Sequence, residues 1–532
     1  MHTPSRLKET LPPKRRSSGH NAVLIGAGIL LSRLIGLVRE RAFAHYFGNS
    51  DAADVFKAAL RIPNLLQNLF GEGALSSSFI PVYAHLLAKG EKEEADRVAR
   101  VIASILAVAM SVLVLAGVLA TPLLIDLIAP GFQGEKRDFT IQIVRILFPG
   151  MGILVLSAWC LGILNSHRRF FLPYAAPVLW NLAMIGALVW FGTTRQSYPL
   201  AETLAWGAVA GSVLQFGVQL PTVLRLVGRI RFQFETVSSN VRTVIRNFVP
   251  GVAARGVNQV SSYVDEILAS FLPAGSIAAL GYAQTLYLLP VSLFGMAISN
   301  AELPEMASRN ESGSEALISL CRRINEAMQR VAFFVIPSLA AILLLGDTIV
   351  AALFQTGRFS QSDVQLVWIV LGGYAVGLLA ATIGRLYTSA YWALRDTRTP
   401  LRFAVVRVTL SALLGWLFAF PLPRAAGIDP RMSVAGLTFA AGISAWVEFG
   451  LLRRSMNRRI GKTGVPYGFL ARVSGAAAGA ALVAFLAKDI VDIAPPYSGI
   501  IVLSIFGAVY LAATATLGVP EALKLLKLAF RR

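Results

Sequence analysis

The chain has 532 residues, of which 55% are hydrophobic and only 15% are charged, and its formal net charge is +20. Soluble proteins average about 25% charged residues, so this composition and a mean hydropathy of +0.63 argue against a string of soluble domains. A basic chain often binds nucleic acid, but an excess of Lys and Arg in cytoplasmic loops explains the charge of a membrane protein without any polyanion. The composition predicts an all-α, polytopic membrane protein with no nucleic-acid partner.

Fourteen apolar stretches are long enough to cross about 30 Å of hydrocarbon, and each is expected to form a transmembrane helix. They cover residues 20–45, 54–86, 99–128, 138–165, 171–193, 198–224, 247–272, 276–302, 327–355, 363–392, 403–422, 432–452, 466–487 and 497–519. Residues 1–19 are basic, and we interpret them as a cytoplasmic tail because no small-residue cleavage site follows.

The distribution of basic residues predicts the orientation of these helices. If both termini lie on one side, that side collects 31 of the 49 Lys and Arg residues, and the opposite loops hold seven. Because Lys and Arg accumulate in cytoplasmic loops, both termini are expected in the cytoplasm. The other eleven basic residues fall within the predicted helices.

An internal repeat divides the chain. Leu69-Phe70-Gly71 resembles Leu293-Phe294-Gly295, and similar matches join the segments around Gly131 and Gly357 and those ending at Pro173 and Pro400, at offsets of 224, 226 and 227 residues. Six helices separate the copies, so we expect two six-helix lobes in a parallel pseudo-twofold repeat plus two C-terminal helices. The expected domains are a tail at 1–19, an N-lobe at 20–230, a C-lobe at 231–455, and a helix pair with a basic tail at 456–532.

Charged side chains inside the predicted helices are the candidates for function, because a charge in the bilayer costs at least about 2.5 kcal/mol unless it faces protein or water. Arg33 and Arg39 are about 9 Å apart along the first helix; they line a cavity or form internal ion pairs, for example between Arg39 and Glu40. The second helix carries Lys57, Arg61 and Asn64. A cavity with several arginines suits an anionic substrate such as a diphosphate, for which guanidinium offers forked donors.

The seventh predicted helix contains an acid among polar neighbours. Asp265 either holds a coupling cation or proton or neutralises Arg255. The cysteines Cys160 and Cys321 are far apart in the sequence, and we interpret both as small buried hydrophobic residues.

Several segments together form a recognisable pattern. They are Ser32-Arg33-Leu34-Ile35-Gly36-Leu37-Val38-Arg39-Glu40, Asp54-Val55-Phe56, Arg61-Ile62-Pro63-Asn64-Leu65-Leu66, Leu69-Phe70-Gly71-Glu72-Gly73-Ala74-Leu75-Ser76, Ala129-Pro130-Gly131-Phe132 and Asp396-Thr397-Arg398-Thr399-Pro400. This pattern resembles the MurJ (MviN) family of lipid II flippases, within the multidrug/oligosaccharidyl-lipid/polysaccharide exporter superfamily. The similarity covers nearly the whole chain after residue 20.

The resemblance implies a transporter, not an enzyme, that moves the diphosphate-sugar-peptide head group of lipid II from the inner to the outer leaflet of the bacterial inner membrane. It implies alternating access, cavity roles for Arg33 and Arg39, and matches for the family's acids at Asp54 and Glu72. We add Lys57, Arg61 and Asn64 as substrate contacts and Asp265 as a candidate for cation coupling. No cofactor is expected, and the energy would come from Na⁺, H⁺ or the membrane potential. Expected partners are lipid II, membrane lipids and, as a further candidate, the cell-wall synthesis machinery.

Two positions depart from the family pattern. Gln67 and Thr285 stand where the family usually has arginine, and Arg61 and Lys57 are candidates to compensate. One alternative is an exporter of another lipid-linked oligosaccharide or of drugs with the same fold. A membrane enzyme is a second alternative, but the five histidines are too dispersed for an acid-base cluster.

Overall fold

The computed structural model describes residues 18–228, 238–307, 314–491 and 493–529, which form helices joined by short loops. Eleven helical segments in this described part are long and apolar enough to cross a membrane. The helices α1, α2, α3 and α9 are not among the eleven. They include the segments in which the sequence places the charges Arg33, Arg39, Lys57 and Arg61.

The first lobe consists of helices α1 to α8. Their bounds are α1 Ser18–Phe47, α2 Asp51–Phe70, α3 Glu72–Ala88, α4 Lys92–Ile128, α5 Gly134–Ser166, α6 Phe171–Ala175, α7 Pro177–Phe191 and α8 Tyr198–Val227. Ser50 begins α2 by accepting a hydrogen bond from the amide of Ala53 at 3.3 Å, as serine commonly does at a helix N-cap. The predicted helix 54–86 is broken at Gly71, where α2 ends and α3 begins.

The second lobe and the C-terminal helices follow. Their bounds are α9 Ser239–Ala269, α10 Ser276–Pro290, a π-helix Val291–Met296, α11 Ala297–Ala307, α12 Ser314–Phe354, α13 Gln361–Ala393, α14 Arg398–Ala419, α15 Pro421–Ala426, a 3₁₀ turn Pro430–Ser433, α16 Val434–Ile460, α17 Tyr467–Lys488, α18 Pro495–Thr516 and α19 Pro520–Ala529. Each of the fourteen predicted ranges contains a helix. The segment Pro520–Ala529, expected as part of a basic tail, forms the short helix α19.

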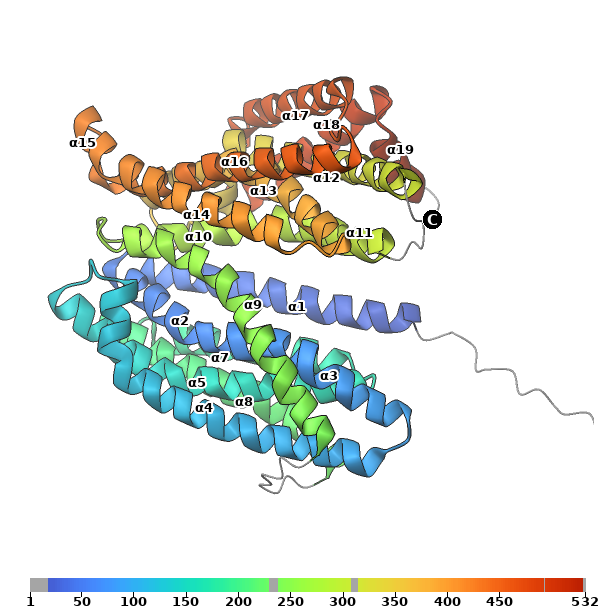
Figure 1. Cartoon of the computed structure of the whole chain (residues 1–532). Helices are drawn as coiled ribbons and strands as arrows, with labels where there is room; N and C mark the ends of the chain where they lie inside the picture. The colour runs from blue at the N-terminus through green and yellow to red at the C-terminus, as the bar shows by residue number, and fades with distance from the viewer. Residues whose placement is uncertain (1–17, 229–237, 308–313, 492, 530–532) are drawn as a thin grey trace, which may run out of the picture.

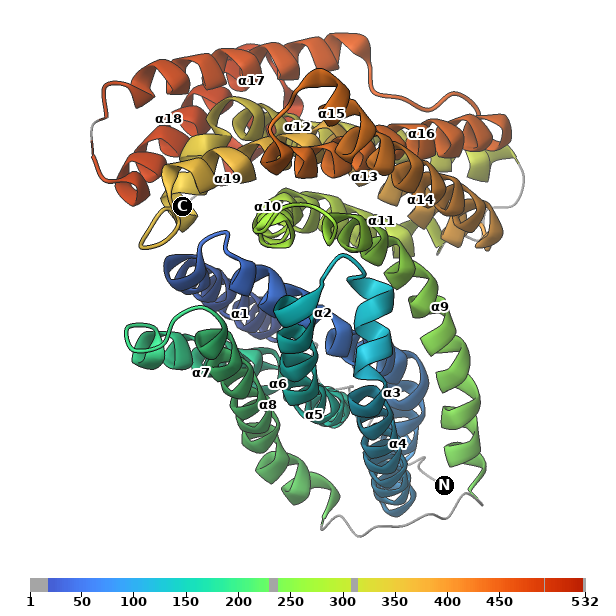
Figure 2. The same cartoon turned by 90° about the vertical axis from the view of Figure 1, so that its left-hand side faces the viewer.

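The two lobes lie one above the other, with α17 and α18 on the outer side of the second (Figures 1 and 2). Helices α12, α17 and α18 share a buried cluster that includes Phe333, Ala477 and Tyr510. The C-terminal pair is therefore packed on the second lobe through α12.

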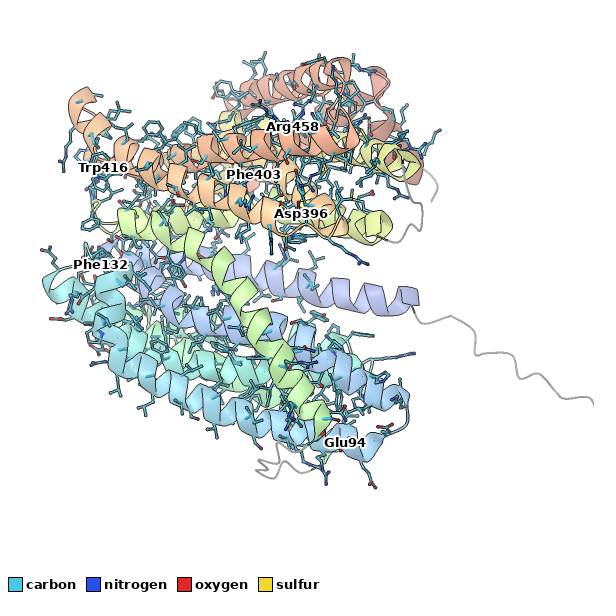
Figure 3. The ribbon with its side chains drawn as sticks, viewed as in Figure 1. Glu94, Phe132, Asp396, Phe403, Trp416 and Arg458 are labelled. Atoms are coloured by element: carbon cyan, nitrogen blue, oxygen red, sulfur yellow. The ribbon has the colours of Figure 1, made fainter. Side chains whose placement is uncertain are left out.

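Helix α9 contacts both lobes, and it runs diagonally between them in Figure 1. At its beginning, Ser238 Oγ lies 2.6 Å from Glu94 Oε1, at the start of α4 (Figure 3), and Val244 is buried among residues of α3 and α4. Near its end, Leu268 approaches Gly415 on α14. The expected lobe boundary at residues 230 and 231 thus falls before a helix that packs on both sides of it.

The loops gather at two ends of the molecule. We call the end with loops 48–50, 129–133, 270–275 and 355–360 the far end; Phe132 is labelled there in Figure 3. We call the opposite end, where the described chain begins and finishes, the terminus end. One buried core cluster runs across both lobes, and Phe43, Tyr282 and Phe359 are among the residues that belong to it.

Candidate functional site

Helices α1 and α2 form a hairpin that brings three predicted or neighbouring charges together. Glu40 Oε1 accepts from Arg39 Nη2 at 2.6 Å, and Glu40 Oε2 accepts from Lys57 Nζ at 2.9 Å. The three side chains are between 14% and 18% exposed. One carboxylate therefore holds two cations, and the group of Arg39, Glu40 and Lys57, which we call the charge triad, has a net charge of +1.

Aromatic rings fix the two cations of the charge triad. The Arg39 guanidinium carbon lies 5.0 Å from the centre of the Trp180 ring on α7. Lys57 Nζ lies 4.1 Å from the centre of the Tyr282 ring on α10 and 5.0 Å from that of Phe43. A cation at such distances is attracted by the negative face of the ring. Because Tyr282 belongs to the second lobe, the charge triad sits where the lobes meet.

Arg33 is exposed, and it points across to the second lobe. Its Nη1 donates to Ser292 Oγ at 2.7 Å. Ser292 lies in the π-helix, a local irregularity that is frequent at functional sites. Among the residues that the structure describes, Arg33 forms no ion pair, so its guanidinium keeps donors for an anionic ligand.

Arg61 links α2 to the end of α9. Its Nε lies 2.9 Å from Glu266 Oε2, and Tyr263 donates from its hydroxyl to the Arg61 carbonyl at 3.3 Å. Glu266 is only 2% exposed. Asp265 precedes it and interacts electrostatically with Arg61 and Arg407. The neighbourhood of Asp265, proposed from the sequence for a cation, already contains two guanidinium groups.

Two further predicted site residues, Asn64 on α2 and Glu72 on α3, are assigned no role by the contacts that the structure describes. Asn64 is half-buried, one turn after Arg61. The side chain of Glu72 lies outside the described part of the chain. In the part that is described, no three His, Cys, Asp or Glu side chains form a group that could hold a metal ion.

Asp54 occupies a different environment, at the contact of the lobes on the far end. Its Oδ2 accepts from the amide of Gly275 and its Oδ1 from the amide of Ala278, both at 2.8 Å. These amides are at the N-terminus of α10, where unpaired N–H groups and the helix dipole favour a carboxylate. Lys136 Nζ lies 3.3 Å from Asp54 Oδ2. Asp54 of the first lobe therefore caps a helix of the second.

At the far end, the backbones of the two lobes are in direct contact at two glycines. Gly275 has φ +89°, and a Cβ added there would lie 2.3 Å from the carbonyl oxygen of Asn49. Gly357 has φ +55°, and its Cβ would lie 2.4 Å from the carbonyl oxygen of His45. Only glycine fits such a close approach without displacing backbone. The far end of the molecule is thus closed.

Side-chain hydrogen bonds add to this closure. Arg41 Nη1 donates to the carbonyls of Ala352 and Leu353, both at 2.8 Å, and these carbonyls are in the last turn of α12. The Tyr282 hydroxyl donates to the Gly48 carbonyl at 3.0 Å. Carbonyls at the end of a helix lack partners within it, so Arg41 satisfies groups that would otherwise be unpaired.

Sequence reasoning did not select four residues that the structure brings to this site: Glu40, Trp180, Tyr282 and Ser292. The position of Glu40 directly after Arg39 was the available signal, and the internal pair of Arg39 with Glu40, one of the expected alternatives, is present. Gln67 and Thr285, which stand where the family usually has arginine, add no charge to the site. Thr285 Oγ1 donates to the Gly281 carbonyl on its own helix at 2.9 Å.

Comparison with known proteins gives consistent results. The family model described as "Lipid II flippase MurJ" matches residues 43–510. A probable lipid II flippase MurJ from Rhizobium tropici is 32% identical over 443 residues, which is 82% of this chain and 80% of that protein. The lipid II flippase MurJ from Burkholderia cenocepacia is 29% identical over 437 residues, 81% of this chain and 82% of that protein.

Solved structures show the same fold. A lipid II flippase MurJ in an inward closed conformation superposes with a TM-score of 0.74 at 24% identity, covering 93% of this chain and 98% of that one. An inward-facing multidrug-resistance transporter of the MATE family, in the MOP superfamily, gives a TM-score of 0.63 at 17% identity, covering 82% and 98%. With the family model matching most of its length, this chain is a multi-pass membrane transporter that belongs to the lipid II flippase MurJ family.

Proposed function

We propose that this protein carries the head group of lipid II across the bacterial cytoplasmic membrane, with Arg33, Arg39 and Lys57 receiving the diphosphate. The observation that carries the proposal is the charge triad with its net positive charge, placed between the lobes of a MurJ family member. Guanidinium groups match the geometry of phosphate oxygens through paired donors. Arg33 and Arg39 offer two such groups on one helix, and Lys57 adds a point charge on the next.

We also propose fourteen membrane crossings with both termini in the cytoplasm. The other three crossings in this proposal are α1, α2 together with α3, and α9, which add to the eleven apolar segments. The 31 basic residues that the sequence assigns to the side of the termini support this orientation. The terminus end then faces the cytoplasm, and the closed far end faces the periplasm.

The transport cycle follows from this orientation. With the far end closed, the head group enters from the cytoplasmic side and meets Arg33 and the charge triad. Rocking of the lobes then separates the far-end contacts, of which the Asp54 cap on α10 is one, and the head group leaves outward while the lipid tail stays in the bilayer. Helices α17 and α18 offer an apolar surface for that tail.

The energy source in this proposal is an ion gradient or the membrane potential, because the sequence has no Gly-x-x-x-x-Gly-Lys-Ser/Thr phosphate loop. Asp265 is the candidate for cation coupling. A cation there would compete with Arg61 and Arg407, both of which act on Asp265. We propose that ion entry and release of Arg61 from α9 are linked.

Complementation tests the proposed substrate. The native lipid II flippase of a test bacterium is depleted, this chain is expressed, and lipid II exposure at the outer face is measured. We expect growth and lipid II exposure to be restored. If a well-expressed, membrane-inserted chain restores neither, then an exporter of another lipid-linked oligosaccharide or of drugs becomes the better assignment.

A further inference from the structure

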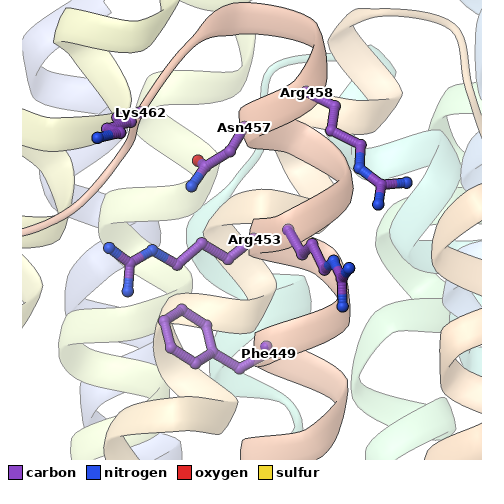
Figure 4. Close-up of a pocket in the computed structure, with 7 residues that line it drawn as sticks. Phe449, Arg453, Asn457, Arg458 and Lys462 are labelled. Atoms are coloured by element: carbon purple, nitrogen blue, oxygen red, sulfur yellow. The ribbon is translucent and has the colours of Figure 1, made fainter.

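A second group of cations lies on α16 at the terminus end, away from the charge triad. A pocket of about 500 Å³ is lined by Phe449, Gly450, Arg453, Arg454, Asn457, Arg458 and Lys462 (Figure 4). Four of these residues are basic, and none is acidic. The proposed transport of the head group uses none of them.

The loop after α16 holds part of this pocket in place. Arg453 Nε donates to the Thr463 carbonyl at 3.0 Å, and the Thr463 amide donates to Asn457 Oδ1 at 3.0 Å. Thr463 is only 2% exposed. The next amide, of Gly464, donates to Asn325 on α12 at 2.9 Å. Arg453 and Asn457 are therefore fixed before any ligand arrives, which lowers the entropic cost of binding.

The pocket cations differ from the arginine beside them. Arg459 pairs with Asp396 at 2.8 Å. Arg454, Arg458 and Lys462 form no ion pair with any residue that the structure describes, and all three are exposed. Their charge is available to a negatively charged group from outside the protein.

The same face of α16 becomes apolar farther from the terminus end. Phe439, Ile443 and Val447 are each 38% exposed, and Gly450, Arg454 and Arg458 continue their row at helical spacing. The row from Phe439 to Val447 is about 12 Å long, close to the hydrocarbon depth of one leaflet, about 15 Å. Gly450 leaves a gap between the apolar and the basic part.

An aromatic residue marks the membrane surface at this level. Tyr467, the first residue of α17, is 91% exposed and follows the pocket loop by a few residues. Exposed tyrosines are typical of the boundary between hydrocarbon and head groups. The basic pocket is thus placed at head-group depth, with an apolar row leading into the membrane.

From this arrangement we infer that the α16 pocket binds the phosphodiester of an anionic phospholipid, with one acyl chain along Phe439, Ile443 and Val447. Arg454, Arg458 and Lys462 bind the phosphate oxygens, and Arg453 offers the donors that it does not use for Thr463. Basic pockets between membrane helices bind such head groups in this manner. The occupant is a membrane lipid and not a soluble phosphate, because the apolar row extends the pocket toward the bilayer.

Native mass spectrometry of the full chain in detergent tests this inference with dioleoyl phosphatidylglycerol as the probe. We expect one molecule to bind saturably, and the double variant Arg454→Gln, Arg458→Gln to bind it roughly 30-fold more weakly. The matched control is Arg242→Gln, Arg246→Gln, which removes two exposed arginines at the same spacing from α9. The control should bind as the unchanged protein does.

Three outcomes would overturn the inference. The unchanged protein could show no saturable binding, the α16 variant could bind as well as the control, or both variants could lose affinity equally, which would indicate general attraction by the basic surface. Two further probes identify the source of the phosphate. Phosphatidylcholine should bind more weakly than phosphatidylglycerol, and inorganic phosphate at millimolar concentration should not displace the lipid; displacement would point to a soluble anion instead.

Discussion

Helices α1 and α9 begin the two lobes, and the expected repeat superimposes their charged residues. Arg39-Glu40 and Asp265-Glu266 are 226 residues apart. Both glutamates pair with α2: Glu40 holds Lys57 at 2.9 Å, and Glu266 holds Arg61 at 2.9 Å. The residue before each glutamate has the opposite charge in the two helices. The expected repeat thus places the same acid in both helices, while the residue before it is a cation in α1 and an anion in α9.

Three of the contacts between the lobes are one-sided, unlike the ion pair of Arg61 with Glu266, which has a charge on each side. The first lobe contributes charged side chains, Arg33, Arg41 and Asp54. Their partners in the second lobe are uncharged: a serine hydroxyl for Arg33, backbone carbonyls at the end of α12 for Arg41, and backbone amides at the start of α10 for Asp54. At these three contacts the charged side chain comes from the first lobe and an uncharged group comes from the second.

The largest expected effect is the loss of transport in Arg39→Ala. This change leaves Lys57 alone with Glu40, so the charge triad becomes neutral. Loss of one hydrogen bond to a charged group costs about 1.5–3 kcal/mol, or roughly 10- to 150-fold in affinity for the diphosphate. Complementation and lipid II exposure measure the effect. Arg472→Ala is the control, since Arg472 is exposed and, among the described residues, bonds the carbonyls of Gly468 on α17 and of Leu517 directly after α18. Equal rescue by both variants would remove Arg39 from the site.

A smaller effect is expected when the cap between the lobes is removed. Asp54→Ala takes two acceptors from the start of α10, and loss of a helix cap costs about 0.5–2 kcal/mol. The ratio of molecules with an open far end to molecules with a closed far end should then rise by up to roughly 30-fold. Distances between spin labels on loops 129–133 and 355–360 measure the opening.

Asp51→Ala is a matched control for this change. Asp51 is one turn earlier on α2 and also bonds Lys136, but its other partner is Tyr198 of the same lobe. It should leave the distribution of far-end distances unchanged. If Asp51→Ala opens the far end as much as Asp54→Ala, the pairing with Lys136 and not the cap on α10 controls closure.

Repeat-related glycines give a third test, which concerns packing inside each lobe. Gly150 on α5 and Gly377 on α13 are 227 residues apart, and each faces the last helix of its lobe. A Cβ at Gly377 would lie 2.6 Å from Cα of Gly442, whereas one at Gly150 would lie 3.2 Å from Cα of Val209. Gly377→Ala should cost about 1–3 kcal/mol of stability through overpacking. Gly150→Ala should cost clearly less, and thermal unfolding in detergent compares the two. A greater loss in Gly150→Ala would show that the second lobe is the looser one.

Much of the fold was predictable because hydrophobic length and the position of Arg and Lys are local properties of the sequence. The approximate helix ranges followed from these properties, and so did the choice of Arg33, Arg39 and Lys57 as candidates, whose roles stay predictions. The cap of Asp54 on α10 joins residues more than 220 positions apart, and no periodicity indicates it. The sequence also did not indicate that α9 packs on both lobes, because helix propensity does not say which neighbours a helix contacts. Glu40 was visible in the sequence, but only the structure shows that it holds two cations at once.

The smallest expected effect concerns the two loops at the terminus end, which repeat the same backbone. Arg168 and Arg395 both have φ 58°, and they are followed by Arg169 in the first lobe and Asp396 in the second. Asp396 accepts from the amide and hydroxyl of Thr399 at 3.0 and 2.7 Å.

These bonds, chiefly the one from the Thr399 amide, and the Arg459 guanidinium lower the pKa of Asp396 from 3.8 to about 2. A carboxyl whose pKa is lower in the folded state stabilises the fold above its unfolded pKa and loses that contribution as the pH falls through its folded pKa. Asp396→Asn should therefore reduce the free energy of unfolding by about the same amount at pH 7 and at pH 5. This loss should be less than about 1 kcal/mol because the site is near the surface. The difference between the variant and the unchanged protein should narrow between pH 4 and pH 2. Thermal unfolding at these pH values measures the stability difference. A difference that stays constant down to pH 2 would mean that the amide of Asn caps α14 less well for steric reasons, independent of charge.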